Sequence, residues 1–159
     1  MSVLDNFVIG RSGGLSPDFQ KARREFEELS RSFDFQIDPR VYVDTLTVGE
    51  RQQLEILRLL WLGARVLIFD EPTTGISAQQ KEKLFVALKK LAGEGKTVIF
   101  VSHKLEEIQE LCSRAAVLRE GALVGELEAP YDLDRVVKMM FGKVVSKGER
   151  EQIDQGETI

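Results

Sequence analysis

Two apolar runs in this sequence end in side chains that suit phosphate chemistry. The run Val66–Phe69 is followed at once by Asp70 and Glu71, and the β-branched run Thr97–Val101 is followed closely by His103, the chain's one histidine. If the two runs are neighbouring strands of one parallel sheet, their carboxyl ends lie at the same edge. Ligands of such sheets gather at that edge.

These side chains could serve different steps of phosphoryl transfer. An aspartate after a strand can hold Mg²⁺ against nucleotide phosphates, and the adjacent glutamate can orient and deprotonate a water. His103 can donate to a terminal phosphate or hold that water. Other interpretations stay open, because acidic residues also solvate loops and helix starts, and a lone histidine more often caps a helix.

A third feature is the stretch "TLTVGERQQLE" at residues 45–55, where Thr47 and Gly49 precede a helical pattern. Free backbone N–H groups at the start of a helix form an anion site. Thr47 is also followed three residues later by Glu50, which is the pattern of a capping box. Both interpretations can hold at once.

The triplet Gly95-Lys96-Thr97 resembles the end of a phosphate-binding loop. That loop needs a further glycine five residues before Gly95, and Lys90 stands there. The loop also follows a strand and opens a helix, whereas here a helical pattern comes first and a β-branched run follows. The sequence therefore predicts a helix end that turns into a strand.

The composition narrows the class of protein. The 159 residues carry a net charge of −4 with acidic and basic residues interleaved, so the basic face typical of nucleic-acid binding is missing. A single cysteine excludes an internal disulfide and fits a reducing compartment. The longest apolar stretch is interrupted by Arg58 and Arg65, which argues against membrane insertion. We expect a soluble chain of cytosolic type without a signal peptide.

The hydrophobic periodicity predicts a helical first third followed by strands that alternate with helices. Such alternation indicates an α/β fold with a mainly parallel sheet and flanking helices. We expect a helical subdomain at 1–63, an α/β core at 64–142 and a polar tail or linker at 143–159. The expected elements are helices near 18–33, 47–63, 77–91, 104–112 and 132–141, strands at 66–69 and 97–101, and a hairpin formed by 115–118 and 122–127.

Taken in order, these motifs resemble the ATP-binding cassette (ABC) family of ATPases. Residues 46–52 stand where that family has its signature motif, 66–71 where it has Walker B, and His103 where it has the switch histidine. "VGERQQLEIL" is similar to the sugar and nucleoside importer branch, and most similar to the first of two tandem cassettes. The resemblance covers residues 1 to about 142 and implies a partial P-loop NTPase fold.

The resemblance also implies roles. Asp70 would bind Mg²⁺ through water, Glu71 would be the catalytic base and His103 would sense the terminal phosphate of ATP. Ser77 falls in the loop after Walker B, which in the family signals between the two nucleotide sites, and it stands where the family commonly has aspartate. The signature positions would contact an ATP held by the opposite cassette: Thr47, Val48, Gly49 and Glu50.

One expected part does not match any stretch of the chain. The phosphate loop and the glutamine loop of the family would both precede Met1, so "VLDNFVIG" would begin at about mid-cassette. Without the loop, three or four hydrogen bonds to charged phosphates are lost, each worth roughly 1.5–3 kcal/mol. We therefore expect the chain alone to be inactive. We also expect unpaired strand edges and exposed apolar faces that favour self-association.

The resemblance implies partners and a location as well. The partners are a second cassette, in tandem or in trans, and the transmembrane permease subunits, with the chain peripheral at the cytoplasmic face of the cell membrane. An alternative is a non-hydrolysing interaction module that docks onto a partner with a phosphate loop. A chromosome-maintenance or repair ATPase shares the motifs, but the acidic net charge and "VGERQQ" argue against it.

Overall fold

The structure is a computed structural model that describes residues 1–9 and 18–142. The chain divides into two compact units, Met1–Lys104 and Leu105–Ile159, and each is described by itself. The expected boundary between a helical subdomain and an α/β core at 63/64 lies inside the first unit and stays a prediction. The tail or linker expected at 143–159 lies outside the described residues.

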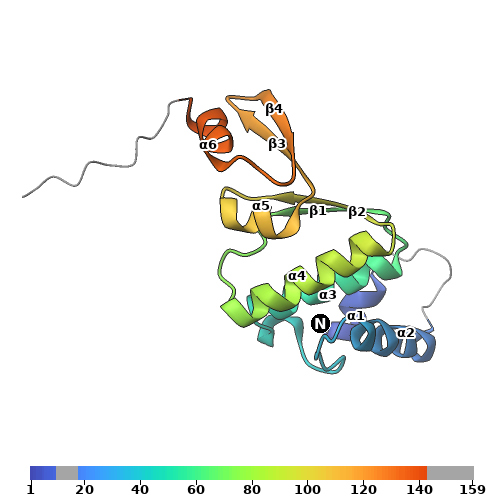
Figure 1. Cartoon of the computed structure of the whole chain (residues 1–159). Coiled ribbons are helices and arrows are strands. Elements are labelled where there is room, and N and C mark those ends of the chain that lie inside the picture. The colour runs from blue at the N-terminus through green and yellow to red at the C-terminus, as the bar shows by residue number, and fades with distance from the viewer. Residues whose placement is uncertain (10–17, 143–159) are drawn as a thin grey trace, which may run out of the picture. The chain divides into compact units, whose positions relative to one another are not determined.

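Helices α1, α2 and α3 form the first part of unit 1 (Figure 1), and aromatic side chains join them. The Phe7 ring packs edge-on against Phe26 at 5.1 Å between centroids and lies 4.7 Å from the Trp61 ring. Phe7 and Phe26 are fully buried, so this contact is the centre of the helical core. The elements are α1 (Val3–Val8), α2 (Phe19–Ser32), a short 3₁₀ turn (Val43–Thr45) and α3 (Val48–Trp61).

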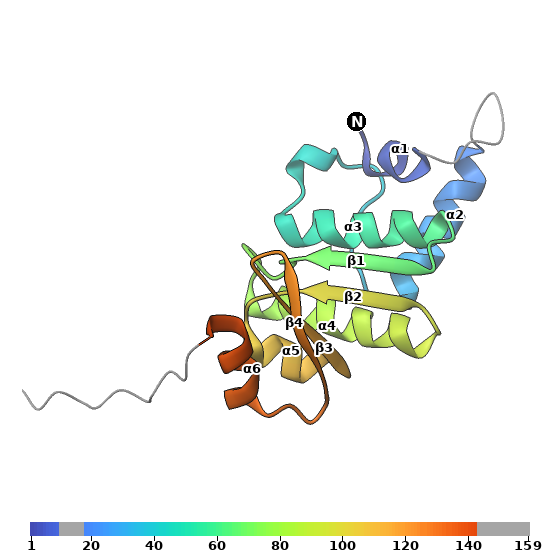
Figure 2. The same cartoon turned by 90° about the horizontal axis from the view of Figure 1, so that it is seen from above.

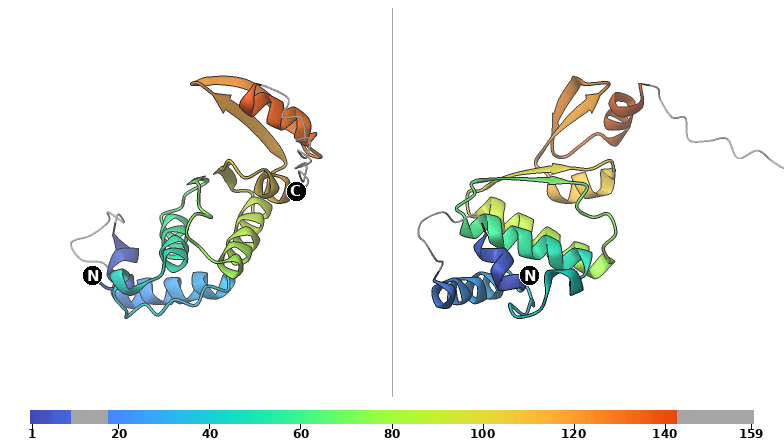
Figure 3. Two further views of the ribbon diagram at one scale, coloured as in Figure 1. Left: turned by 90° about the vertical axis from the view of Figure 1, so that its left-hand side faces the viewer. Right: turned by 180° about the vertical axis from the view of Figure 1, so that it is seen from behind.

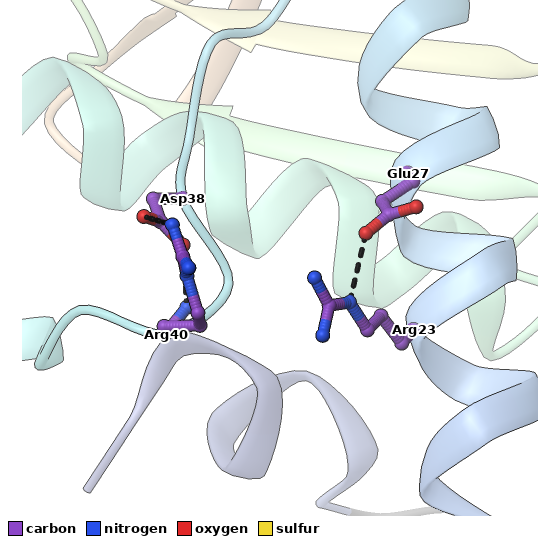
Figure 4. Close-up of polar contacts among 4 residues, drawn as sticks. All are labelled: Arg23, Glu27, Asp38 and Arg40. Atoms are coloured by element: carbon purple, nitrogen blue, oxygen red, sulfur yellow. Dashed lines mark hydrogen bonds and ion pairs between the residues drawn. The ribbon is translucent and has the colours of Figure 1, made fainter.

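The loop between α2 and the 3₁₀ turn holds α1 through its carbonyl groups. The Pro39 carbonyl accepts a hydrogen bond from the Leu4 N–H at 3.0 Å. Next to it, the Arg40 guanidinium donates to both carboxylate oxygens of Asp38, at 3.0 and 2.8 Å (Figure 4). These bonds lower the pKa of Asp38 to about 2. On α2, Arg23 makes a single hydrogen bond, from Nε to Oε1 of Glu27 one turn away, at 2.9 Å (Figure 4).

A parallel pair of strands follows, β1 (Val66–Asp70) and β2 (Thr97–Val101), with α4 (Ala78–Gly93) as the crossover. Their arrowheads point the same way in Figure 2. The register runs from Val66 opposite Thr97 to Asp70 opposite Val101. Helix α4 covers one face of the pair, where the Phe85 and Phe100 rings meet edge to face at 5.9 Å.

The other face of this sheet is exposed. An unbroken apolar run such as Val66–Phe69 is typical of a strand buried on both faces. Val66 and Ile68 are instead 54% and 66% exposed, and on β2 the side chains of Ile99 and Val101 are 45% and 46% exposed. Among the described residues nothing covers this face, so the run is buried on one side alone.

Unit 2 is a β-hairpin that carries a helix on one face (Figure 3). Its core joins Val117 and Leu127 of the hairpin to Val136 of the helix. Glu120 and Gly121 both have positive φ, 52° and 78°, as the two central residues of a type I′ turn do. The elements are α5 (Leu105–Leu111), β3 (Arg114–Arg119), β4 (Ala122–Glu128) and α6 (Leu133–Phe141).

Candidate functional site

The parallel register of β1 and β2 brings Glu71 and His103 into direct contact. The backbone N–H of Glu71 donates to the Val101 carbonyl at 2.9 Å, which ties the two strand ends together. Oε1 of Glu71 lies 2.7 Å from Nδ1 of His103 and accepts the His103 backbone N–H at 3.1 Å. The expected meeting of these two side chains at one sheet edge is therefore confirmed.

The second carboxylate oxygen of Glu71 is buried. Within the described residues, Oε2 has no hydrogen-bond partner. A buried polar atom left unsatisfied costs about 1–3 kcal/mol. The backbone of Glu71 is also unusual, with φ of +46°, a conformation that is strained for a residue other than glycine. Strain and an unsatisfied oxygen therefore coincide at one residue.

Asp70 is the last residue of β1, and its side chain is exposed at the same end of the sheet. The described residues contain no group of three or more His, Cys, Asp or Glu side chains that could hold a metal ion. A cation at Asp70 would therefore have fewer than three such side chains as ligands in the described structure. Magnesium is commonly held in this way, by one or two carboxylates together with water and substrate phosphates.

The N-terminus of α3 contains the predicted capping box. Thr47 is the N-cap, and its hydroxyl accepts from the Glu50 N–H at 3.3 Å while Glu50 Oε2 accepts from the Thr47 N–H at 2.8 Å. Val48 is 51% exposed on the first turn, whereas Gly49 is buried. The capping interpretation is thus confirmed. The anion-binding interpretation of the same residues stays a prediction.

Two glutamines connect this helix to the segment that follows β1, and the sequence did not single out either. Gln52 of α3 donates to the Pro72 carbonyl at 2.5 Å. Gln80 of α4 donates to the Thr47 hydroxyl at 3.3 Å and accepts from the Ser77 N–H at 3.0 Å. The spacing Ser-x-x-Gln could have revealed the Ser77 bond as a second capping box. No sequence signal indicates the other two contacts.

A further bond holds the two loops of the sheet edge together. Nζ of Lys104 donates to the hydroxyl of Thr73 at 2.9 Å, and Thr73 is 6% exposed. The bond joins the turn after β2 to the loop after β1, each two residues or fewer from the Glu71–His103 contact. The geometry of that contact is therefore fixed from both sides.

The Gly95-Lys96-Thr97 triplet lies where a helix ends and a strand begins. Gly95 has φ of +82°, the left-handed conformation that favours glycine after a helix. The Lys96 ammonium donates to the Ala64 carbonyl at 3.0 Å. Thr97 is the first residue of β2. The prediction of a helix end turning into a strand is confirmed.

Comparison with known proteins identifies the family of this chain. A family profile described as ABC transporter matches residues 1–74. The ribose import ATP-binding protein RbsA 1 of Rubrobacter xylanophilus is 40% identical over 100% of this chain and 32% of its own length. The galactose/methyl galactoside import ATP-binding protein MglA of Escherichia coli K12 is 35% identical over 92% of this chain and 29% of its own. The chain thus spans about a third of these relatives.

The fold has a solved counterpart. The dimeric post-hydrolysis structure of an ATP-binding cassette bound to ADP and Pi superposes with a TM-score of 0.64 and 21% identity, covering 80% of this chain and 56% of that one. Among residues 1–9 and 18–142, no helix has the length and apolar character needed to cross a bilayer. The sequence relatives and the shared α/β fold agree, and the chain belongs to the ABC transporter family.

Proposed function

We propose that the chain supplies the catalytic carboxylate, the switch histidine and the signature helix of an importer ATPase. The complete protein would couple ATP hydrolysis to uptake of a sugar- or nucleoside-like solute. The relatives that match along most of the chain are named as ribose and galactose import proteins, which supports a sugar as the solute.

The observation that carries this proposal is the state of the Glu71 carboxylate. Oε1 is held by His103, and Oε2 is buried without a partner in the described structure. A water that donates to Oε2 would satisfy that oxygen and lie next to an acceptor for its proton. Glu71 is thereby suited to act as the general base that activates water for attack on the terminal phosphate.

On our proposal, His103 orients the Glu71 carboxylate and forms a hydrogen bond to the terminal phosphate. An ionised carboxylate is an acceptor only, so Nδ1 of His103 must carry the hydrogen in the 2.7 Å contact with Glu71. The neutral ring then offers Nε2 as an acceptor for the attacking water, and the protonated ring donates to a phosphate oxygen. The side chain is 71% exposed, which leaves it accessible to a ligand.

Asp70 and the N-terminus of α3 would contact the nucleotide and its cation. Asp70 would hold Mg²⁺ through water, and that ion would neutralise charge on the phosphates when it is bound. The free N–H groups of α3 suit an anion, here the terminal phosphate of an ATP held by a second cassette. The nucleotide-contacting positions on our proposal are Thr47, Val48, Gly49, Glu50 and, before α4, Ser77.

The chain alone is not expected to hydrolyse ATP. No stretch of its 159 residues matches the phosphate-loop pattern. Lys96, the lysine of the Gly95-Lys96-Thr97 triplet, donates to the backbone carbonyl of Ala64. Losing three or four hydrogen bonds to phosphate costs on the order of 5–10 kcal/mol. That loss turns micromolar affinity into worse than millimolar. A second cassette and permease subunits, at the cytoplasmic face of the membrane, would be the working partners.

The test is ATP hydrolysis by a completed cassette. We define this as the 159-residue chain joined to the phosphate-loop-bearing part of the Rubrobacter xylanophilus ribose import relative. Glu71→Gln should lower kcat at least 100-fold, because general-base catalysis contributes about 10²–10⁴-fold, and should leave ATP binding intact. Glu28→Gln, the same change at an exposed position of α2, is the matched control.

Two results would count against the proposal. If Glu71→Gln hydrolyses ATP at the wild-type rate, Glu71 is not the base. If the wild-type completed cassette binds ATP but never hydrolyses it, the alternative of a non-hydrolysing module that docks onto a phosphate-loop-bearing partner is favoured. The match to the signature motif would hold in either case, since it does not depend on hydrolysis.

A further inference from the structure

The side-chain amide of Gln80 joins the N-caps of two helices. Its Oε1 accepts the backbone N–H of Ser77, and the Ser77 hydroxyl accepts the Gln80 N–H at 3.2 Å, which closes the capping box of α4. Its Nε2 donates to the hydroxyl of Thr47, the N-cap of α3. The two caps are 30 residues apart in the sequence and share this one side chain.

The bond to Gln80 completes the hydrogen bonding of the Thr47 hydroxyl. A hydroxyl has one hydrogen to donate and two lone pairs to accept with. The hydrogen goes to Glu50 Oε2 at 2.8 Å, one lone pair accepts the Glu50 N–H, and the other accepts Nε2 of Gln80. A change at any of these partners therefore changes the orientation of the hydroxyl.

Gly49 makes the reach of Gln80 possible. A Cβ atom built on Gly49 would lie 2.6 Å from Nε2 and 2.7 Å from Cδ of Gln80, well inside van der Waals contact. The amide of Gln80 thus packs directly on the backbone of the α3 first turn. Two independent observations, the hydrogen bond to Thr47 and this close packing on Gly49, locate Gln80 at the same helix end.

We infer that Gln80 is a positioning residue that couples the N-terminus of α3 to the loop before α4. The inference rests on the proposed function, in which Thr47 and Gly49 contact a phosphate. Phosphate oxygens at this end accept hydrogen bonds, so the Thr47 hydroxyl has to turn its hydrogen away from Glu50 to bind one. This rotation of the Thr47 hydroxyl changes the direction of the lone pair that accepts the Gln80 hydrogen bond. The Gln80 amide then shifts, and with it the capping bond to Ser77.

The coupling is tested first in the chain as it stands, by backbone amide NMR. Gln80→Glu keeps an acceptor for the Ser77 N–H, but a carboxylate cannot donate to Thr47, whose own hydrogen is already committed to Glu50. We expect the amide signals of Gly49 and Glu50 to shift while that of Ser77 stays near its wild-type position. Gln79→Ala, at an exposed neighbouring glutamine, is the control and should leave these signals unchanged.

The second test is steady-state ATPase kinetics of the completed cassette. We expect Gln80→Glu and Gln80→Ala to lower kcat at least tenfold with KM for ATP within twofold, because the phosphate loop sets KM. Gln79→Ala should match the wild type. Thr47→Ser keeps the hydroxyl and should retain most of the rate. Thr47→Val should lose at least as much rate as Gln80→Ala, and Gln80→Ala should add little to Thr47→Val in the double variant, because Gln80 acts through the Thr47 hydroxyl.

The outcomes separate this inference from the proposed function. Wild-type kcat in Gln80→Glu, or equal losses in Gln80→Ala and Gln79→Ala, would overturn the coupling while leaving the function intact. If the wild-type completed cassette does not hydrolyse ATP, the proposed function fails and the NMR comparison decides the coupling alone. Unshifted Gly49 and Glu50 signals in Gln80→Glu would then overturn it.

Discussion

At the scale of single residues, Glu71 and Asp38 show how one side-chain chemistry acquires two characters. Each carboxylate is in hydrogen-bond contact with a side-chain nitrogen of a nearby residue, Arg40 for Asp38 and His103 for Glu71. The pair of Asp38 and Arg40 is closed within one exposed loop, with both carboxylate oxygens used. Glu71 shares one oxygen with His103 and keeps the other buried and unsatisfied. The Asp38–Arg40 pair stabilises the conformation of its loop, whereas Oε2 of Glu71 is left to accept a hydrogen bond from a water or a ligand.

The sequence predicted some of this and could not predict the rest. The meeting of Glu71 and His103 followed from two consecutive parallel strands. The burial of Oε2 did not, and neither did the left-handed backbone of Glu71, because both depend on how the loop after β1 closes over the sheet end. The bond from Lys96 to the Ala64 carbonyl was equally invisible, although the reversed order of helix and strand already excluded a phosphate loop.

The Asp38 pair predicts a pH dependence of stability. The hydrogen bonds from Arg40 lower the pKa of Asp38 from 3.8 to about 2 in the folded state. Because the folded pKa is depressed, the stabilisation is fully present above about pH 4 and is lost as the pH falls towards 2. Asp38→Asn should therefore flatten the decline of the melting temperature between pH 4 and pH 2.

Arg40→Gln is the matching variant, since it removes the donor and keeps the carboxylate. Its melting curve should be flattened over the same pH window, measured by circular dichroism in a series of buffers at constant ionic strength. Acid limbs parallel to the wild type in both variants would show that this pair does not couple to folding.

At the scale of elements, helix ends were the best predicted features and tertiary links the least. Thr47 was expected to open a helix, and it is the N-cap of α3. The helix that begins after Ser77 runs to Gly93, two residues beyond its expected end, because the left-handed turn comes only at Gly95. No sequence rule relates Gln80 to Thr47, since that contact depends on how α3 and α4 are placed by the sheet.

The buried stripe of α3 predicts where this element is vulnerable. Leu57 is fully buried, and Leu57→Ala should lower the free energy of unfolding by about 2–5 kcal/mol through lost contacts and a cavity. Leu62→Ala, at a side chain that is 40% exposed just after the helix, should stay within about 0.5 kcal/mol. Urea denaturation measures both. Similar losses in the two variants would contradict the assigned core.

At the scale of the whole molecule, the described chain carries an unpartnered apolar sheet face. An unbroken apolar run such as 66–69 is typical of a strand covered on both sides, and the sequence cannot say which residues would cover it. In the described structure α4 covers one face, and the β1–β2 pair has no third strand. Exposed apolar faces and free strand edges favour association between chains.

The exposed face predicts self-association of the isolated chain. Ile99 lies opposite Ile68 in the register of β1 and β2, and both are exposed. Ile99→Lys should shift the mass measured by light scattering towards the monomer, because a charge resists burial between two sheets. Val86→Lys, the matched change at a 62% exposed position of α4, should leave the mass unchanged. A wild-type chain that is monomeric at high concentration would contradict the prediction.

The central claim is that this chain carries the proposed base, the switch histidine and the signature helix but not the loop that binds the phosphates. Calorimetric titration of Mg-ATP into the chain alone and into the completed cassette tests it most directly. We predict no detectable binding to the chain alone at millimolar ATP and micromolar binding to the completed cassette. Micromolar binding to the chain alone that disappears in Lys96→Ala would contradict the claim and show that the Gly95-Lys96-Thr97 triplet binds nucleotide after all.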